Sequence, residues 1–424
     1  LTTTQLSGLS STQLSGMTAT QIKTVSTTAI AGLSTSQFSG FTTAAVQGLT
    51  TTQINNLASA TLSGISSSQL AGFTSTQIAG LSAGLFPSLS SGQLSGLTVT
   101  QVKGLSTTNL ALIETTQLSG ISSTQLAGLS ATQLKNLSDT AVGDLSTSQF
   151  SGFTVTAVAG MTTTQLNLLT TATLSGVNSA QLNGITATQL NGLTAGTMAS
   201  LTSVQFSGLS ATQIAGINAA GFANITSGQL TGLSSTQVKS IATAALATLT
   251  TTQLSGLSST QLSGMTTTQI KTVSTTAIAG ISTSQFSGFN TLQVTGLTTT
   301  QINNLASATL SGIASSQLAG FTSTQIGGLS AGLFPSLSSG QLSGLTVTQV
   351  KGLSTTNLGI LETSQLSGLS STQLSGLSAT QLKNLSDSAI AGINTSQFSG
   401  FTATAVAGMT TTQLNLLTTA TLSG

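Results

Sequence analysis

The sequence predicts a repeat solenoid of 53 octads, each folded as a short capped helical turn. The chain divides into eight-residue units from Leu1 to Gly424 without an insertion or a deletion. Positions 1 and 6 of every octad are apolar, position 2 is Ser or Thr in 43 octads, and position 5 is Gln in 35. The consensus is Leu-Ser/Thr-x-Thr-Gln-Leu-x-Gly, and its strict phasing indicates order despite the Ser- and Thr-rich composition.

Each conserved position of the octad has a place in a one-turn helix. Ser or Thr at position 2 suits the N-cap, and Gln at position 5 is then the third helical residue, which makes a capping box. The apolar residues at positions 1 and 6 form the hydrophobic staple pair. Gly or Asn at position 8 suits a left-handed residue that ends the helix. The octad at 9–16, LSSTQLSG, shows all of these features.

Two other backbone conformations fit the octad less well. In a continuous α-helix the apolar positions would drift by about 80° per octad and wind around every face. In a regular strand positions 1 and 6 would lie on opposite faces. A bend inside each octad would repair the strand, and Thr, Ile and Val favour β structure. A β-solenoid therefore stays as the alternative fold.

An isolated one-turn helix is unstable in water, so the octads must stack in coils. Among the first 31 octads, 11 lack Gln at position 5, a ratio near 2.8. We expect a coil of about 2.8 octads, roughly 22 to 23 residues, in which one angular position disfavours Gln. The residues that replace Gln are Ala29, Ala45, Thr61, Leu85, Asn109, Ala141, Ala157, Thr173, Thr197, Gly221 and Ala245.

A longer repeat lies above the octad. Residues 1–176 recur almost unchanged at 249–424, a shift of 248 residues. We therefore predict a long unit at 1–248, with sub-blocks 1–112 and 113–248, followed by a partial second copy at 249–424 in the same continuous solenoid. Because the chain begins without Met, we expect it to be a piece of a longer protein.

The chain has very few charges, with seven lysines, no Arg and five acidic residues. The lysines are too scattered to neutralise a nucleic-acid backbone, and no apolar run approaches the length of a membrane span. The absence of Cys excludes disulfides and thiolate metal sites. We expect no nucleic-acid partner, no membrane span in this segment and no cofactor.

All seven lysines occupy position 7, which is therefore predicted to face solvent. Lys135 lies four residues from Asp139, and Lys383 lies four residues from Asp387, which predicts weak surface ion pairs. The full set of lysines is Lys23, Lys103, Lys135, Lys239, Lys271, Lys351 and Lys383.

The remaining unusual residues have structural explanations. Glu114 and Glu362 stand at the N-cap position, where a carboxylate is favourable. The 14 Phe residues all lie at positions 1 or 6 and are predicted to fill the core, although exposed rings would form a stacking platform for sugars. Pro87 and Pro335 lie in the octad LSAGLFPS, where we expect a local kink or loop.

No residue pattern points to catalysis. There is no His to activate the abundant hydroxyl groups, and the five acids are too dispersed to form paired carboxylates or a calcium site. We therefore predict that the protein is not an enzyme, with no catalytic, cofactor-binding or metal-binding residues and no small-molecule substrate.

The whole chain resembles the low-complexity octad arrays, of the type LSTTQ-apolar-x-x-L, in giant surface or secreted, adhesin-like proteins of bacteria. The resemblance implies export and a role at the cell exterior. We expect a structural protein that associates with its own copies into a fibre, filament, sheath or surface layer. A passive adhesin stalk is the alternative, and an ice-binding solenoid is a third reading.

Overall fold

The secondary structure of the chain is helical throughout the part that the structure describes. The computed structural model describes residues 1–423. Its helices run from α1 (Thr3–Ser7) to α51 (Thr419–Leu422), with two 3-10 helices, η1 (Phe86–Ser88) and η2 (Phe334–Ser336), between them. Within residues 1–423 there is no strand, so the chain does not adopt the alternative β-solenoid.

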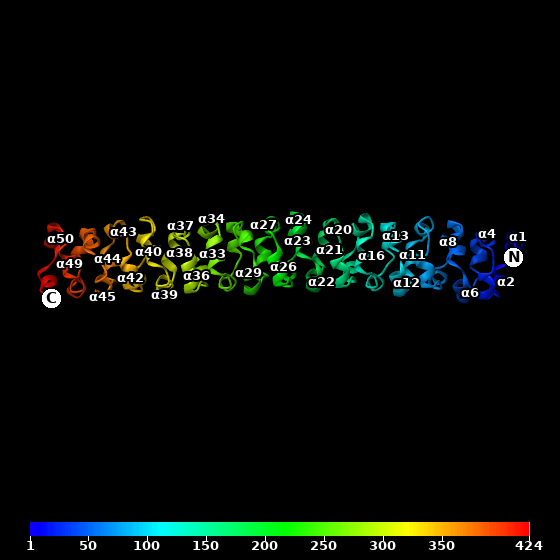
Figure 1. The fold of residues 1–424 in the computed structure, drawn as a ribbon, viewed down its shortest axis with the longest axis horizontal. Coiled ribbons are helices and arrows are strands. Elements are labelled where there is room, and N and C mark those ends of the chain that lie inside the picture. The colour runs from blue at the N-terminus through cyan, green and yellow to red at the C-terminus, as the bar shows by residue number, and fades with distance from the viewer. Residues whose placement is uncertain (424) are drawn as a thin grey trace. The chain divides into compact units, whose positions relative to one another are not determined.

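The chain forms two compact units, Leu1–Leu209 and Ser210–Gly424. Within each unit the short helices follow one another in chain order (Figure 1). Most helices pack against the helix that lies three elements further along the chain. Thus α3 (Ala19–Lys23) contacts α6 (Thr43–Gly48) in the first unit, and α33 (Thr267–Thr272) contacts α36 (Thr291–Gly296) in the second. Each unit is therefore a helical repeat array of solenoid character.

The predicted capping box starts the helices. Every α-helix begins at position 3 of an octad and ends at position 6, 7 or 8. At α37 (Thr299–Asn303), Gln301 N donates to Thr298 Oγ1 over 3.1 Å, and Thr298 N donates to Gln301 Oε1 over 2.8 Å. Two amide groups that the first turn leaves free are thereby paired.

The core of each unit consists of the apolar residues at positions 1 and 6, as the pattern predicts. Phe286, at position 6, is fully buried. Its ring lies edge-on to Phe289, with centroids 5.3 Å apart, and stacks on Phe321 at 6.5 Å. Because Phe286 and Phe321 lie 35 residues apart, these contacts join successive coils and fill the interior.

Gly at position 8 does not have the left-handed conformation that the sequence predicted. No residue between 1 and 423 has a positive φ angle, so these glycines are not left-handed helix ends. They allow coils to approach closely instead. A Cβ on Gly296 would lie 2.8 Å from Thr267 O and 3.0 Å from Thr267 Cα, in the helix one coil earlier. A side chain at this point would therefore collide with backbone.

The predicted coil length is close to the stacking that the structure shows. Helices that pack together, such as α33 and α36, begin at Thr267 and Thr291, which lie 24 residues or three octads apart, beside the expected 22 to 23 residues. Hydrogen bonds between these coils join different positions of the octad, so their partners lie 25 to 31 residues apart. Thr283 Oγ1 donates to Ala308 O, 25 residues later, and Gln301 Nε2 donates to Val273 O and Ile270 O, 28 and 31 residues earlier.

The two Pro-containing octads stay within the stack but lose their α-helix. In the first, Leu85 replaces Gln at position 5, and Phe86–Ser88 form η1 with Pro87 inside it. Leu85 and Phe86 are both buried. The expected disturbance is therefore a tighter 3-10 turn, because Pro lacks the N–H that an α-helical bond needs.

Candidate interaction surface

In most octads the glutamine at position 5 joins successive coils and is buried. Gln301 is 1% exposed. Its Nε2 donates to Val273 O over 2.7 Å and to Ile270 O over 2.9 Å, while its Oε1 accepts from Thr298 N. The same pattern recurs along both units, and we call these inter-coil contacts the glutamine ladder. The glutamine that marks position 5 of the octad is thus structural and, where it is buried, does not belong to the outer surface.

Thr and Asn preserve part of this ladder at several of the positions where they replace Gln, whereas Ala, Leu and Gly cannot. Thr309 Oγ1 donates to Ile281 O over 2.8 Å, and Asn357 Nδ2 donates to Leu329 O over 2.9 Å. Asn357 is one methylene shorter than Gln, and its Oδ1 is buried without a hydrogen-bond partner. The residues that replace Gln are themselves buried, as in Thr309 and Asn357, so position 5 faces the interior in these octads too.

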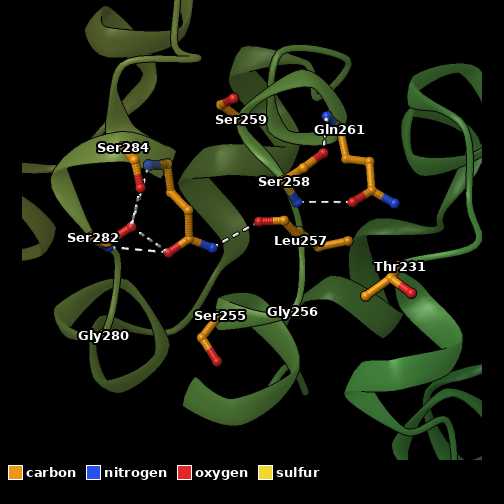
Figure 2. Close-up of a pocket in the computed structure, with 11 residues that line it drawn as sticks. Thr231, Ser255, Gly256, Leu257, Ser258, Ser259, Gln261, Gly280, Ser282 and Ser284 are labelled. Atoms are coloured by element: carbon orange, nitrogen blue, oxygen red, sulfur yellow. Dashed lines mark hydrogen bonds between the residues drawn. The ribbon is translucent and has the colours of Figure 1, made fainter.

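The outer surface is made of hydroxyl groups from positions 2, 4 and 7. In the groove of Figure 2, Ser282 and Ser284 lie on one coil and Ser255 and Ser258 on the one before. Ser282 Oγ and Ser284 Oγ are 3.0 Å apart, and the groove has a volume of about 630 Å³. The surface is polar and almost uncharged, which suits repeated hydrogen bonding.

The lysines lie on this surface, as their position in the octad predicts. All seven side chains are exposed. The ion pairs expected for Lys135 with Asp139 and for Lys383 with Asp387 stay predictions. The backbone of some lysines still serves the ladder, since Lys351 O accepts from Gln381 Nε2 over 2.9 Å.

One lysine-lined groove occurs twice. The first copy has a volume of about 600 Å³ and includes Lys23, Thr50 and Thr76. The second has a volume of about 560 Å³, and all of its lining positions are those of the first copy shifted by 248 residues. The long repeat therefore reproduces a surface feature.

The acidic residues remain separate. Glu114 is the N-cap of α14 (Thr115–Leu118), and its N–H donates to Gln117 Oε1 over 3.1 Å. Asp144 Oδ2 accepts from Thr115 Oγ1 over 2.8 Å. Among residues 1–423, no group of three potential His, Cys, Asp or Glu ligands lies together.

The Phe rings do not form the alternative sugar platform. Phe38, Phe150, Phe206 and Phe286 are at most 1% exposed, and no Phe ring of residues 1–423 is exposed.

Within the same residues, no helix has both the length and the apolar character needed to cross a bilayer. A scan of models of known protein families found no match to the chain, and a search of curated proteins found no similar sequence.

Proposed function

We propose that this is a structural protein of the cell exterior that associates with its own copies into a fibre, filament, sheath or surface layer. The observation that carries the proposal is the regular surface of hydroxyl groups. The buried glutamine amides form hydrogen bonds within the chain, so the hydroxyl groups are the polar groups that remain on the outside. We also propose that the octad register runs unbroken through all 53 units, so that the surface repeats without interruption.

The physical argument rests on repetition and low charge. With 12 charged residues among 424, two copies meet little electrostatic repulsion. A hydrogen bond between hydroxyl groups of two copies is weak by itself, because it replaces hydrogen bonds to water. Many identical contacts at a fixed spacing add up once the first has formed, because each later contact is intramolecular.

Sedimentation over a wide range of protein concentration, followed by electron microscopy of the assemblies, tests the proposal. We expect ordered filaments or sheets above a threshold concentration. Isolated particles that stay monomeric at high concentration would contradict self-association and favour the adhesin stalk.

A surface variant supplies a matched comparison. Position 7 carries Lys in seven octads, so Ser255→Lys, Ser287→Lys and Ser343→Lys place charges where the fold already accepts them. We expect this triple variant to keep its helix content and to assemble only at higher concentration, with the difference reduced by salt. The replacement of the same residues by Thr should leave assembly unchanged.

A further inference from the structure

Among residues 1–423, two buried side-chain oxygen atoms have no hydrogen-bond partner, and they stand at equivalent places in the two units. They are Asn109 Oδ1 in the first unit and Asn357 Oδ1 in the second. Both asparagines occupy position 5 of the octad, 248 residues apart, and each is 1% exposed. A buried carbonyl oxygen without a partner costs free energy, and most such atoms in proteins are paired with protein or with water. These two atoms therefore mark places where the chain alone does not satisfy its polar groups.

A glutamine in the preceding octad shows how position 5 is satisfied elsewhere. Gln349 Oε1 accepts over 2.7 Å from the N–H of Thr346, which is the N-cap of α42 (Val347–Lys351). Its Nε2 donates to Leu318 O and Phe321 O, 31 and 28 residues earlier. One carboxamide thus pairs the first amide of its own helix and also the carbonyls of the coil before it.

The shorter asparagine satisfies only one of these two sides. Asn357 Nδ2 donates over 2.9 Å to Leu329 O, the carbonyl 28 residues earlier that corresponds to the glutamine acceptor. With the nitrogen held there, the amide oxygen falls short of the N-cap by one carbon–carbon bond, about 1.5 Å. The capping box of α43 (Thr355–Gly359) is therefore incomplete: Ser354 Oγ accepts from Asn357 N over 3.1 Å, but Asn357 Oδ1 does not reach Ser354 N.

The Ser354 N–H is directed toward the same gap as the asparagine oxygen. Ser354 has φ −71° and ψ 151°, close to the φ −76° and ψ 159° of Thr346, whose N–H donates to its glutamine. Among residues 1–423 no acceptor for the Ser354 N–H is formed. An unpaired donor and an unpaired acceptor therefore face each other across a gap too long for a direct hydrogen bond.

The first unit repeats this arrangement. Asn109 Nδ2 donates to Leu81 O over 3.0 Å, and Ser106 Oγ accepts from Asn109 N over 3.2 Å. The N-cap of α13 (Thr107–Ala111) again lacks the second bond of the capping box. Ser106 and Ser354 are both half-buried, so the gap beside each asparagine is close to the surface.

We propose that one ordered water molecule occupies each gap, donating to the asparagine Oδ1 and accepting from the N–H of the N-cap serine. The occupant has to donate on one side and accept on the other, which water does and a simple ion does not. A metal cation would pair with the oxygen but be repelled by the N–H, and an anion would do the reverse. Water commonly bridges polar groups that lie more than about 3.5 Å apart, and a buried water needs two to four polar partners. The water completes the capping boxes of α13 and α43.

A crystal structure of the full chain, at a resolution that shows ordered water, tests the proposal. We expect one density peak in each unit at hydrogen-bond distance, about 2.7 to 3.2 Å, from both the asparagine Oδ1 and the serine N. Gln349 is the internal comparison, because its oxygen already accepts from Thr346 N and leaves no place for water. The proposal is overturned by empty density at both asparagines, by a peak that contacts only one of the two groups, or by the same peak beside Gln349.

A reciprocal pair of variants separates the water from a general property of this coil. In Asn357→Gln the longer side chain reaches Ser354 N directly, so the second unit should lose its water while the first unit keeps the water at Asn109. In Gln349→Asn the reverse change should create a water between residue 349 and Thr346 N. A water retained in Asn357→Gln, or no new water in Gln349→Asn, would refute the assignment.

Hydrogen exchange supplies a readout in solution. The Ser354 amide should exchange severalfold more slowly in Asn357→Gln, because a direct bond to a fixed side chain replaces a bond to a mobile water. The Ser106 amide of the same variant should keep its wild-type rate. An unchanged rate at Ser354 would contradict the proposal. The site lies within each unit, so this result is independent of whether copies of the chain associate.

Discussion

Gln301 and Val273 lie on successive coils, and Gln301 Nε2 donates to the Val273 carbonyl oxygen over 2.7 Å. The Val273 carbonyl lies where the chain passes from one helix to the next. The same amide group accepts from Thr298 N through Oε1. One side chain thus starts its own helix and fastens that helix to the preceding coil.

We expect Gln301→Ala to destabilise this part of the second unit by about 2 to 4 kcal/mol, because three buried polar groups lose their partner. Hydrogen exchange should show faster exchange around residues 270–303, since repeat arrays open locally. Gln13→Ala is the control. Gln13 is exposed and has the capping bond to Ser10 N but no bond to another coil, so about 1 kcal/mol is expected there.

Gln301→Glu should introduce a dependence on pH. The new carboxylate would be buried and would face the carbonyl oxygens of Ile270 and Val273, so its pKa should rise above the usual value of about 4.3. The folded variant then binds a proton more tightly than the unfolded chain. Its stability should be greatest below about pH 4 and should fall as pH rises through the raised pKa.

Thermal unfolding of Gln301→Glu between pH 3 and pH 8, compared with the wild type at each pH, checks this expectation. The wild type supplies the control, because Gln301 does not titrate. A constant difference between the two proteins across the range would contradict it.

Much of the local fold could be predicted from the sequence, because helix starts depend on nearby residues. The capping box of Thr298 and Gln301 lies within one octad, and the sequence pattern contains both of its members. The partner of Gln301 Nε2 is a backbone carbonyl 28 residues away, and every residue type has one. No side-chain pattern marks such an acceptor, so the ladder could not be predicted.

The role of Gly296 shows the same limit. In a sequence, Gly after a helical segment suggests a left-handed helix end. The actual reason for Gly296 is the collision of a side chain with Thr267 of another coil, and the neighbouring residues in the sequence do not reveal that contact.

Gly296→Ala should destabilise the second unit by about 1 to 3 kcal/mol, because the added Cβ would meet the backbone of Thr267, which cannot move aside without displacing α33. Urea unfolding followed by circular dichroism measures the change. Gly332→Ala is the matched control, since a Cβ there has no atom within 4 Å. We expect it to be neutral or slightly stabilising.

Ala314→Ser should stabilise the second unit by about 1 kcal/mol. Ala314 is an N-cap without a hydroxyl, whereas its counterpart 248 residues earlier, Ser66, accepts from Gln69 N over 3.2 Å. The reverse change, Ser66→Ala, should destabilise the first unit by a similar amount. Hydrogen exchange at residues 315–318 and 67–70 should report opposite shifts, and equal shifts of the same sign would refute the cap explanation.

The glutamine ladder has a consequence for how such a gene can lengthen. The ladder acceptors are backbone carbonyls at fixed octad positions, so adding or removing eight residues returns each amide to an acceptor of the same kind. A single inserted residue would shift the spacing by one and direct the amide to a different backbone group. Duplication of whole octads therefore preserves the ladder, whereas insertion of a single residue does not. The shift of 248 residues between the two copies is a multiple of eight, as this requires.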